Sequence, residues 1–337
     1  MAIDRTHPST IARAVANDTS SATPSYGDRN KSTSVNVRSP SSAPSSSSNG
    51  TNKETDGEVL IELRDVKKAF GSKVVLDGAS FKVRRGEAVG IIGPSGTGKS
   101  TVLRIMAGLL VPDEGEVYIC GERRVGLASD ETKPKLRVGM VFQSAALFDS
   151  LTVGENVGFK LYEHSDLAPE EIRRLVKKSL AAVGLQGSED KYPAQLSGGM
   201  KKRAALARAI IKDDHLRGVN DGAEVEEVVM YDEPTAGLDP VASTVVEDLM
   251  RSLHCKPSST SNLSDEECNV NNGEIGGVTS YIVVTHQHST IRRSVDRIVF
   301  LHKGKVAWEG TVEEFDTTTE PIVRQFATGS LQGPITY

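Results

Sequence analysis

The feature that most constrains the fold of this chain is a glycine-rich segment between an apolar run and a helical pattern. Residues 93–100 read GPSGTGKS; the apolar run Ala88–Ile92 comes directly before them, and helical sequence extends over 99–109. A short, continuous apolar run is typical of a parallel strand that is buried on both faces. In this context the spacing GxxxxGK[ST] predicts a phosphate-binding loop. A purely structural glycine turn is the alternative, and the flanking strand and helix weigh against it.

The residues of this loop predict a nucleoside triphosphate and a magnesium ion as ligands. Glycines let successive backbone N–H groups turn toward phosphate oxygens, and the start of the helix adds positive partial charge. We expect Lys99 to reach the β- and γ-phosphates and the Ser100 hydroxyl to bind Mg²⁺. The residues predicted to contact the nucleotide are Gly93, Pro94, Ser95, Gly96, Thr97, Gly98, Lys99, Ser100 and Thr101.

Two adjacent carboxylates end a later apolar run. Residues 228–233 read VVMYDE, so Asp232 and Glu233 fall at the C-terminal end of a predicted strand. Paired acids at a strand end are commonly only solvated, but their position after the phosphate-binding loop favours a site. We expect Asp232 to hold Mg²⁺ through water and Glu233 to polarise an attacking water. The chain is therefore predicted to hydrolyse a nucleoside triphosphate as well as to bind it.

A third motif, LSGGM at 196–200, opens a predicted helix with a second anion-binding pattern. Ser197 and the amides of Gly198 and Gly199 suit a phosphate at a helix start, although a simple helix cap is the alternative. Here the sequence resembles the ABC ATPase family, whose signature is LSGGQ. Met200 replaces the family's glutamine, while the serine and the glycines that carry the phosphate contact are retained.

This resemblance implies roles for three further residues. Gln143 matches the glutamine that senses Mg²⁺ and the transporter partner, and Asp239, within AGLDP at 236–240, would lie at a dimer seam. His286 matches the histidine that contacts the γ-phosphate. The implied catalytic residues are Glu233, His286 and Gln143, and the implied metal ligands are Ser100, Gln143 and Asp232.

Two ring side chains complete the predicted site. Phe70 falls where the family places an aromatic residue against adenine; a core phenylalanine is the alternative, because the family usually has tyrosine there. His288 lies two residues beyond the predicted switch histidine and is interpreted as a surface histidine.

The resemblance covers about residues 58–310 and implies an α/β fold. The expected architecture is an ABC-type P-loop NTPase with a RecA-like core, an antiparallel β subdomain and a helical signature subdomain. Because the chain has one copy of each motif, two chains are expected to close head to tail around ATP, residues 93–100 of one facing 196–200 of the other. Strands are predicted at 59–66, 74–83, Ala88–Ile92, 116–120, 138–142, 228–231, 281–284, 297–301 and 305–308, and helices at 99–109, 169–183, 198–212 and 240–254.

The domain boundaries follow from composition. We expect a presequence at 1–56, a nucleotide-binding domain at 57–312 and a C-terminal tail at 313–337, with polar surface insertions at 213–226 and 255–277. The presequence has almost nothing to bury, which predicts disorder. Its first 50 residues hold 13 serines and five basic residues against three acidic ones, which favours a chloroplast transit peptide over a plain disordered tail.

The sequence between the motifs resembles one branch of the ABC family. The runs VFQSAALFDSLTVGENV and LSGGMKKRAALARAI are similar to the Mla-type ATPases of bacterial phospholipid transport. The runs AGLDPVASTVVEDLMRS, VVTHQHSTIRRSVDR and FATGSLQGPITY are similar to the plastid relatives of the trigalactosyldiacylglycerol (TGD) lipid-importer type. This resemblance implies a peripheral ATPase on the stromal face of the chloroplast inner envelope, with phosphatidic acid as the cargo. Its implied partners are a second copy of the chain, a multi-span permease and a membrane-anchored lipid-binding subunit.

Composition argues against several other classes of protein. The net charge of −5 argues against a nucleic-acid binder, and no run approaches the roughly 20 apolar residues of a membrane helix, so membrane association is expected through partners only. The three cysteines show no CxxC spacing and are expected to be reduced. An importer ATPase for another solute and a soluble, non-transport ABC ATPase remain as alternative functions. The alternative location is the cytoplasm, with the protein peripheral to a membrane. The intact predicted catalytic set argues against an inactive regulatory subunit.

Overall fold

The computed structural model describes residues 57–131, 135–211, 226–254 and 278–335, all within the unit Gly57–Tyr337. The presequence predicted at 1–56, the insertion 255–277 and all of the insertion 213–226 except Glu226 lie outside the described residues. Cys255 and Cys268 lie outside them too, whereas Cys120 is a half-buried free thiol whose pKa is raised by burial.

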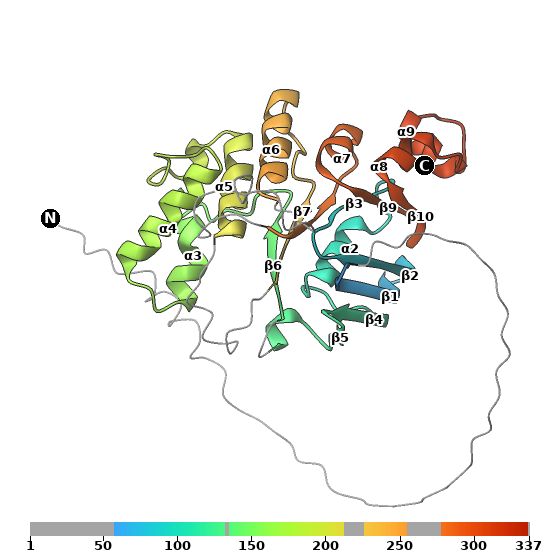
Figure 1. The fold of residues 1–337 in the computed structure, drawn as a ribbon, viewed down its shortest axis with the longest axis horizontal. Coiled ribbons are helices and arrows are strands. Elements are labelled where there is room, and N and C mark those ends of the chain that lie inside the picture. Colours follow the sequence, from blue (N-terminus) through green and yellow to red (C-terminus); the bar gives the residue numbers. More distant parts are fainter. Residues whose placement is uncertain (1–56, 132–134, 212–225, 255–277, 336–337) are drawn as a thin grey trace, which may run out of the picture. The chain divides into compact units, whose positions relative to one another are not determined.

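A six-stranded sheet in the order β10-β9-β3-β8-β7-β6 carries the residues of the predicted site (Figure 1). Its strands are β3 (Ala88–Ile92), β6 (Leu136–Val141), β7 (Glu226–Asp232), β8 (Ser280–Val284), β9 (Arg297–His302) and β10 (Lys305–Thr311). Every pair in it is parallel except β9 with β10. All residues of β3 and β8 are buried, as continuous apolar runs predict for strands that are covered on both faces. The C-terminal ends of β3, β6, β7 and β8 therefore meet at one edge of the sheet.

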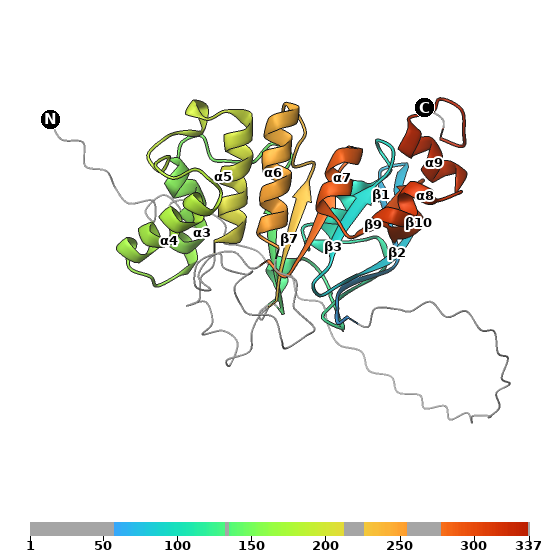
Figure 2. The same cartoon turned by 45° about the horizontal axis from the view of Figure 1, so that its top comes forward.

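The N-terminal part of the unit contributes a smaller antiparallel sheet, whose strands lie in the order β2-β1-β4-β5. Its strands are β1 (Val59–Phe70), β2 (Lys73–Arg84), β4 (Glu114–Ile119) and β5 (Glu122–Arg123), and helix α2 (Lys99–Met106) follows the glycine-rich loop. Strand β2 of this sheet contacts β10 of the larger sheet (Figure 2). One buried hydrophobic cluster contains Leu63 of β1, Leu103 of α2 and Val284 of β8. The helix that begins at the phosphate-binding loop is thus held by both sheets.

A group of helices forms the predicted helical subdomain. Helices α3 (Val153–His164), α4 (Pro169–Ala182) and α5 (Gly198–Ile210) contact one another, and α6 (Pro240–Ser252) contacts α5. The sequence did not predict α3, because glycines at 154 and 158 interrupt its apolar pattern. A Cβ atom on Gly158 would lie 2.9 Å from Val176 of α4, so the glycine permits a close helix–helix approach. Short 3₁₀ helices lie at Ala128–Asp130 and Pro193–Gln195.

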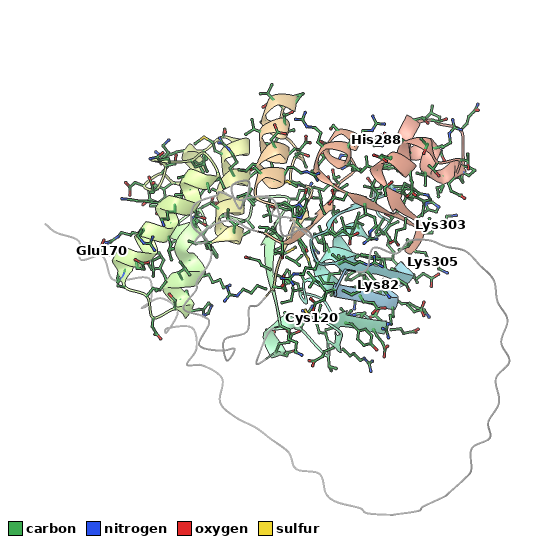
Figure 3. The ribbon with its side chains drawn as sticks, viewed as in Figure 1. Lys82, Cys120, Glu170, His288, Lys303 and Lys305 are labelled. Carbon is green, nitrogen blue, oxygen red and sulfur yellow. The ribbon has the colours of Figure 1, made fainter. Side chains whose placement is uncertain are left out.

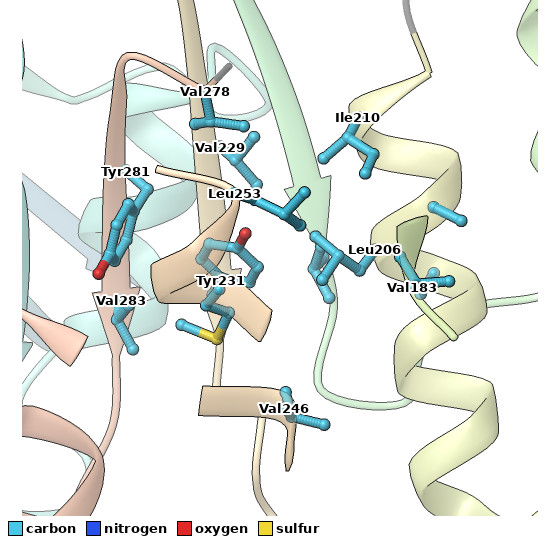
Figure 4. Close-up of a cluster of buried hydrophobic side chains, with 14 of the residues drawn as sticks. Val183, Leu206, Ile210, Val229, Tyr231, Val246, Leu253, Val278, Tyr281 and Val283 are labelled. Carbon is cyan, nitrogen blue, oxygen red and sulfur yellow. The ribbon is translucent and has the colours of Figure 1, made fainter. Parts of the chain in front are cut away.

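The helical subdomain and the parallel sheet share one hydrophobic core. Leu206 and Ile210 of α5 face Val229 and Tyr231 of β7 across this cluster (Figure 4). The Tyr231 and Tyr281 rings meet edge to face, with centroids 5.9 Å apart. Burying these side chains is the main favourable contribution to holding α5 against the sheet.

The last three helices, α7 (His288–Ser294), α8 (Val312–Thr317) and α9 (Pro321–Thr328), pack on the same core. Phe315 and Val323 are almost fully buried in it, and so is Ile335. Gln325 of α9 ties the end of the described chain back: its Oε1 accepts from Ile335 N at 2.6 Å, and its Nε2 donates to Ile335 O at 3.0 Å. The boundary predicted at 312/313 remains a prediction, and it coincides with the start of α8.

The interpretation of His288 as a surface histidine is wrong. Its ring is half-buried, with centroids 6.0 Å from Phe315 and 5.2 Å from Phe326, beside the C-terminal helices (Figure 3). Burial lowers the pKa of His288 and favours the neutral imidazole. The sequence did not reveal this environment, because α8 and α9 reach His288 only through the tertiary fold. No helix among the described residues is long and apolar enough to cross a bilayer.

Replacing Phe315 with alanine tests whether the C-terminal helices stabilise the unit. Phe315 is 2% exposed, and we expect its truncation to lower the free energy of unfolding by about 3–5 kcal/mol, through lost apolar burial and a cavity. The measurement is urea unfolding of the nucleotide-free protein. Leu331→Ala is the control, because Leu331 is 98% exposed and its loss should change stability by less than about 0.5 kcal/mol. Equal effects of the two substitutions would contradict a stabilising role for α8.

Candidate functional site

The glycine-rich loop leaves the end of β3 in a conformation that requires glycine. Gly93 has φ +146°, and a Cβ atom there would lie 2.1 Å from the Leu301 carbonyl oxygen. Gly98 caps α2 with φ +96°, in the left-handed region. Thr97 Oγ1 donates to Pro94 O at 2.9 Å and closes the loop on itself. The loop therefore has the tight turn and the helix start that the sequence predicted.

Lys99 lies at the first position of α2 and is buried. Its Nζ donates to Gly93 O at 2.9 Å and to Pro94 O at 3.0 Å. Burial lowers the pKa of Lys99, while the nearby negative charges of Glu233 and Asp232 oppose that shift. A buried ammonium whose hydrogen bonds go only to loop carbonyls is well suited to an anionic phosphate, which would pair with its charge.

Ser100 and Asp232 form a pair of oxygen donors. Ser100 Oγ donates to Asp232 Oδ1 at 2.8 Å, although the two residues come from α2 and β7. Hydroxyl and carboxylate oxygens are ligands that Mg²⁺ prefers, and Mg²⁺ usually keeps waters and substrate phosphates as its remaining ligands. The described residues contain no group of three or more His, Cys, Asp or Glu side chains that could hold a metal by themselves. This pair therefore fits a magnesium ion that is shared with a nucleotide.

Glu233 and His286 are brought together from the ends of β7 and β8. His286 Nδ1 lies 2.9 Å from Glu233 Oε1, and the imidazole is the more exposed of the two side chains. Glu233 has a left-handed backbone, with φ +50°, and its N–H donates to Val284 O at 2.9 Å. A non-glycine residue in this region is uncommon and costs conformational energy, so neighbouring groups must hold this backbone in place.

A buried polar network, which the sequence analysis missed, holds the segment around His286. Gln287 Oε1 accepts from Thr235 Oγ1 at 2.9 Å, and Thr290 Oγ1 donates to Glu247 Oε1 at 2.6 Å. Thr235 and Thr290 hydroxyls lie 3.3 Å apart, and Glu247 is almost fully buried in α6. Side-chain hydrogen bonds therefore join the segments that follow β7 and β8. No local sequence pattern marks these residues, because they come from the segment after β7, from α6 and from the start of α7.

Gln143 and the signature residues occupy separate positions. Gln143 follows β6, whose neighbour in the sheet is β7, and its side chain is exposed. Ser197 is the N-cap of α5 and accepts from Met200 N at 3.3 Å. Both Ser197 and Gly198 are exposed, and Leu238 of the AGLDP segment lies close to Gly198. The described bonds do not join this helix start to the glycine-rich loop of the same chain.

Of the two remaining predicted residues, Phe70 lies at the surface and Asp239 is the N-cap of a helix. Phe70 is 52% exposed at the β1–β2 turn, with Lys68 Nζ 5.8 Å from its ring centroid, so it is not a core phenylalanine. Asp239 caps α6 by accepting from Val241 N at 3.0 Å and Ala242 N at 2.9 Å. The contacts of Phe70 with adenine and of Asp239 with a second chain remain predictions.

Comparison with known proteins places these features in a family. A family profile described as ABC transporter matches residues 76–217. The chain is 60% identical over 284 residues to Protein TRIGALACTOSYLDIACYLGLYCEROL 3, chloroplastic, of Arabidopsis thaliana, covering 84% of this chain and 78% of that protein. It is 33% identical to the intermembrane phospholipid transport system ATP-binding protein MlaF of Escherichia coli K12, covering 82% of this chain and 92% of that protein.

Solved structures agree with this relationship. The ATP-binding cassette MJ0796, solved as a dimer in a post-hydrolysis state bound to ADP and Pi, has a TM-score of 0.58 and 30% identity and covers 75% of this chain and 99% of that chain. The predicted fold class is confirmed by this likeness and by the two sheets and helical group described above. The chain belongs to the ABC transporter family and is an ATP-binding ABC transporter ATPase.

Proposed function

We propose that this chain is the ATPase subunit of a transporter that moves phospholipid-type lipids, with phosphatidic acid as the cargo, into plastids across the inner envelope. The observation that carries the proposal is the 60% identity to the chloroplastic Arabidopsis protein over 84% of this chain. The 33% identity to MlaF, which is named for intermembrane phospholipid transport, supports the same lipid class.

The proposed chemistry is ATP hydrolysis at the edge where β3, β7 and β8 end. Bound ATP supplies the phosphoanhydride bond whose hydrolysis drives transport. Lys99 and the backbone of residues 93–101, through its N–H groups at the positions other than Pro94, bind the phosphates, while Ser100, Asp232 and Gln143 would hold Mg²⁺, Asp232 through water. Phe70 stacks on the adenine, which its exposed ring permits.

Glu233 is the proposed general base. One of its carboxylate oxygens accepts a hydrogen bond from the attacking water and takes up a proton as the water oxygen bonds to the γ-phosphorus, while the bond from that phosphorus to the β–γ bridging oxygen breaks and ADP leaves. His286, whose Nδ1 lies 2.9 Å from Glu233 Oε1, steadies the γ-phosphate and keeps the carboxylate oriented. The left-handed backbone of Glu233 and the Thr235–Gln287 hydrogen bond support this placement.

The proposed working unit contains two copies of the chain. Ser197, Gly198 and Gly199 of each copy would complete the site that the partner begins with residues 93–100, since Ser197 and Gly198 are exposed and all three lie at a helix start suited to an anion. The dimeric state of MJ0796, a relative with 30% identity, supports this arrangement.

The remaining partners and the location are proposed from the relatives. A multi-span permease and a membrane-anchored lipid-binding subunit would hold the ATPase at the stromal face of the inner envelope, with no nucleic acid involved. Residues 1–56 would act as the transit peptide, 57–312 as the nucleotide-binding domain and 313–337 as its C-terminal tail.

A second candidate is an ABC importer ATPase for another solute. It is favoured by relatives named as probable ribonucleotide transport ATP-binding proteins, such as mkl of Mycobacterium tuberculosis H37Rv. That protein is 33% identical over 82% of this chain, against 60% for the chloroplastic relative, so we rank this candidate second.

Isolation of the native complex tests the lipid proposal. We expect the tagged protein, purified from plastid envelopes in mild detergent, to carry a multi-span permease and a lipid-binding subunit identifiable by mass. Alkaline carbonate should release the ATPase from envelopes while the permease stays in the membrane, because the ATPase is held by protein contacts alone. Recovery of a permease for a water-soluble solute would support the second candidate, and recovery without any membrane protein would contradict both.

A further inference from the structure

The signature helix carries a buried lysine that the mechanism above does not use. Lys202 lies in the second turn of α5 and is 6% exposed. Its Nζ donates to the carbonyl oxygen of Gln143 and, at 3.3 Å, to the carbonyl oxygen of Glu233. One ammonium therefore bonds the backbones of two predicted catalytic residues that are 90 positions apart in the sequence (143 and 233).

The charges around Lys202 are those of the hydrolytic site. Burial lowers the pKa of Lys202, and the negative charges of Asp232 and Glu233 oppose that shift. The same two carboxylates act on Lys99. Two buried ammonium groups, from α2 and α5, thus face one carboxylate pair. A cation is costly to bury unless it is paired and hydrogen-bonded; Lys202 has two carbonyl acceptors and the nearby negative charges of Asp232 and Glu233.

Glu233 is a residue whose backbone needs such support. Its φ of +50° is unfavourable for a side chain with a Cβ atom and persists only where neighbouring groups hold it. Its N–H donates to Val284 O, and its carbonyl accepts from Ala236 N at 3.2 Å as well as from Lys202. Of these three contacts, Lys202 is the one that comes from the helical subdomain.

The same helix holds the loop after Gln143 at a second point. Arg208 Nη1 donates to Ala146 O at 2.7 Å and Nη2 to Ala145 O at 3.0 Å. Both alanines have a left-handed backbone, with φ of +63° at Ala145 and +48° at Ala146. This loop therefore also has an unfavourable backbone, which the hydrogen bonds from Arg208 help to maintain. The position of α5 therefore sets the position of the loop that begins at Gln143.

We propose that Lys202 is a positioning residue for ATP hydrolysis, which fixes Gln143 and Glu233 relative to each other and to the signature helix. The inference rests on the catalytic roles proposed for Gln143 and Glu233. It predicts that movement of α5 is transmitted to the general base through Lys202. Without the ammonium, the carboxylate and the glutamine loop lose their common anchor, while the phosphate-binding loop at 93–100 is unchanged.

The test compares Lys202→Met with Lys202→Arg and with Lys201→Met, in full-length protein. Methionine keeps the length and apolar stem of lysine but removes its donors, and arginine restores charged donors. Lys201 is the neighbouring, half-exposed lysine of α5 and serves as the matched control. Steady-state ATPase kinetics, the Kd for ATP and the melting temperature are measured for each variant.

We expect Lys202→Met to lower kcat by about 10-fold to 100-fold, since misplacing a catalytic group by about 1 Å has an effect of this size. KM and the Kd for ATP should stay within about twofold, because Lys202 bonds no residue of the phosphate-binding loop. Lys202→Arg should recover most of kcat, and Lys201→Met should equal the wild type. If Lys202→Met does not fold, a reduced kcat with unchanged KM in Lys202→Gln, whose amide keeps a neutral donor, supports the same role.

Three outcomes would overturn the inference. They are a wild-type kcat in Lys202→Met, a parallel loss of kcat and ATP affinity, and a loss of kcat that arginine does not recover. Glu233→Gln, measured alongside, separates this inference from the proposed function. If Glu233→Gln abolishes turnover and Lys202→Met does not lower it, only the positioning role fails. If Glu233→Gln leaves turnover intact, the proposed function fails, whatever the lysine variants do.

Discussion

Replacing Glu233 with glutamine is expected to lower kcat for ATP hydrolysis by about a hundred-fold to ten-thousand-fold, the range typical of a general base. The amide keeps the size of the side chain and its hydrogen bond to His286, whose Nδ1 lies 2.9 Å from the present carboxylate, but it cannot take up a proton from water. ATP binding should survive, because Lys99, Ser100 and the loop amides are untouched. The nucleotide-bound dimer should therefore accumulate.

Phosphate release and size-exclusion chromatography in ATP and Mg²⁺ measure these two effects. Glu170→Gln is the matched control: Glu170 is exposed in the first turn of α4, and its surface ion pair with Arg173 contributes little. It should leave both turnover and the elution volume unchanged. Wild-type turnover in Glu233→Gln would contradict the role of Glu233, and loss of ATP binding would place the residue in the binding machinery instead.

Replacing Lys99 with alanine is expected to raise the Kd for ATP by about tenfold to a hundredfold. This follows from a charge-assisted hydrogen bond of about 1.5–3 kcal/mol, at about 1.4 kcal/mol for each factor of ten. The stability of the folded, nucleotide-free protein should change less than the affinity for ATP. Burial already lowers the pKa of Lys99, so its removal also removes an unfavourable buried charge.

Thermal unfolding with and without ATP separates the two effects. In the wild type, ATP at about 100 times its Kd should add about 2.7 kcal/mol of stability, and at the same ATP concentration this increment should fall to about 1.4 kcal/mol or less in Lys99→Ala. The melting temperature of the nucleotide-free variant should stay within about 4 °C of the wild type. Lys177→Ala, an exposed substitution on α4, should keep the full increment. A full ATP-induced increment in Lys99→Ala would show that the ammonium does not contribute to binding.

The local parts of the fold could be predicted from the sequence because their signals are contiguous. The apolar run Ala88–Ile92 is a strand with the predicted limits, and α4 and α5 differ from their predicted ends by one or two residues. The pairing of the strands was not predicted; it brings the carboxylates at the end of β7 and the histidine after β8 to one edge, since the carboxyl ends of neighbouring parallel strands lie together. The approach of Glu233 to His286 is the result of that rule.

The elements that escaped prediction have weak local signals. Helix α3 contains two glycines, and its capping box at Thr152 and Glu155 is a short pattern within an otherwise irregular stretch. Helices α8 and α9 have 6 and 8 residues, too few for a clear apolar repeat, so their packing on α7 depends on the tertiary fold. The wrong interpretation of His288 had the same cause, because the rings that cover it come from these helices.

The sequence by itself determined the predicted chemistry of each motif: a phosphate-binding loop, a carboxylate pair, a signature helix start and a switch histidine. These depend on which residue types stand next to one another, and that order is visible in the chain. Only the tertiary structure decided which groups hold the catalytic residues in place. Lys202, Arg208 and the Thr235–Gln287 pair bond partners that are 31 to 63 positions away, and such bonds depend on how α5, β6, β7 and β8 stack, which no local periodicity encodes.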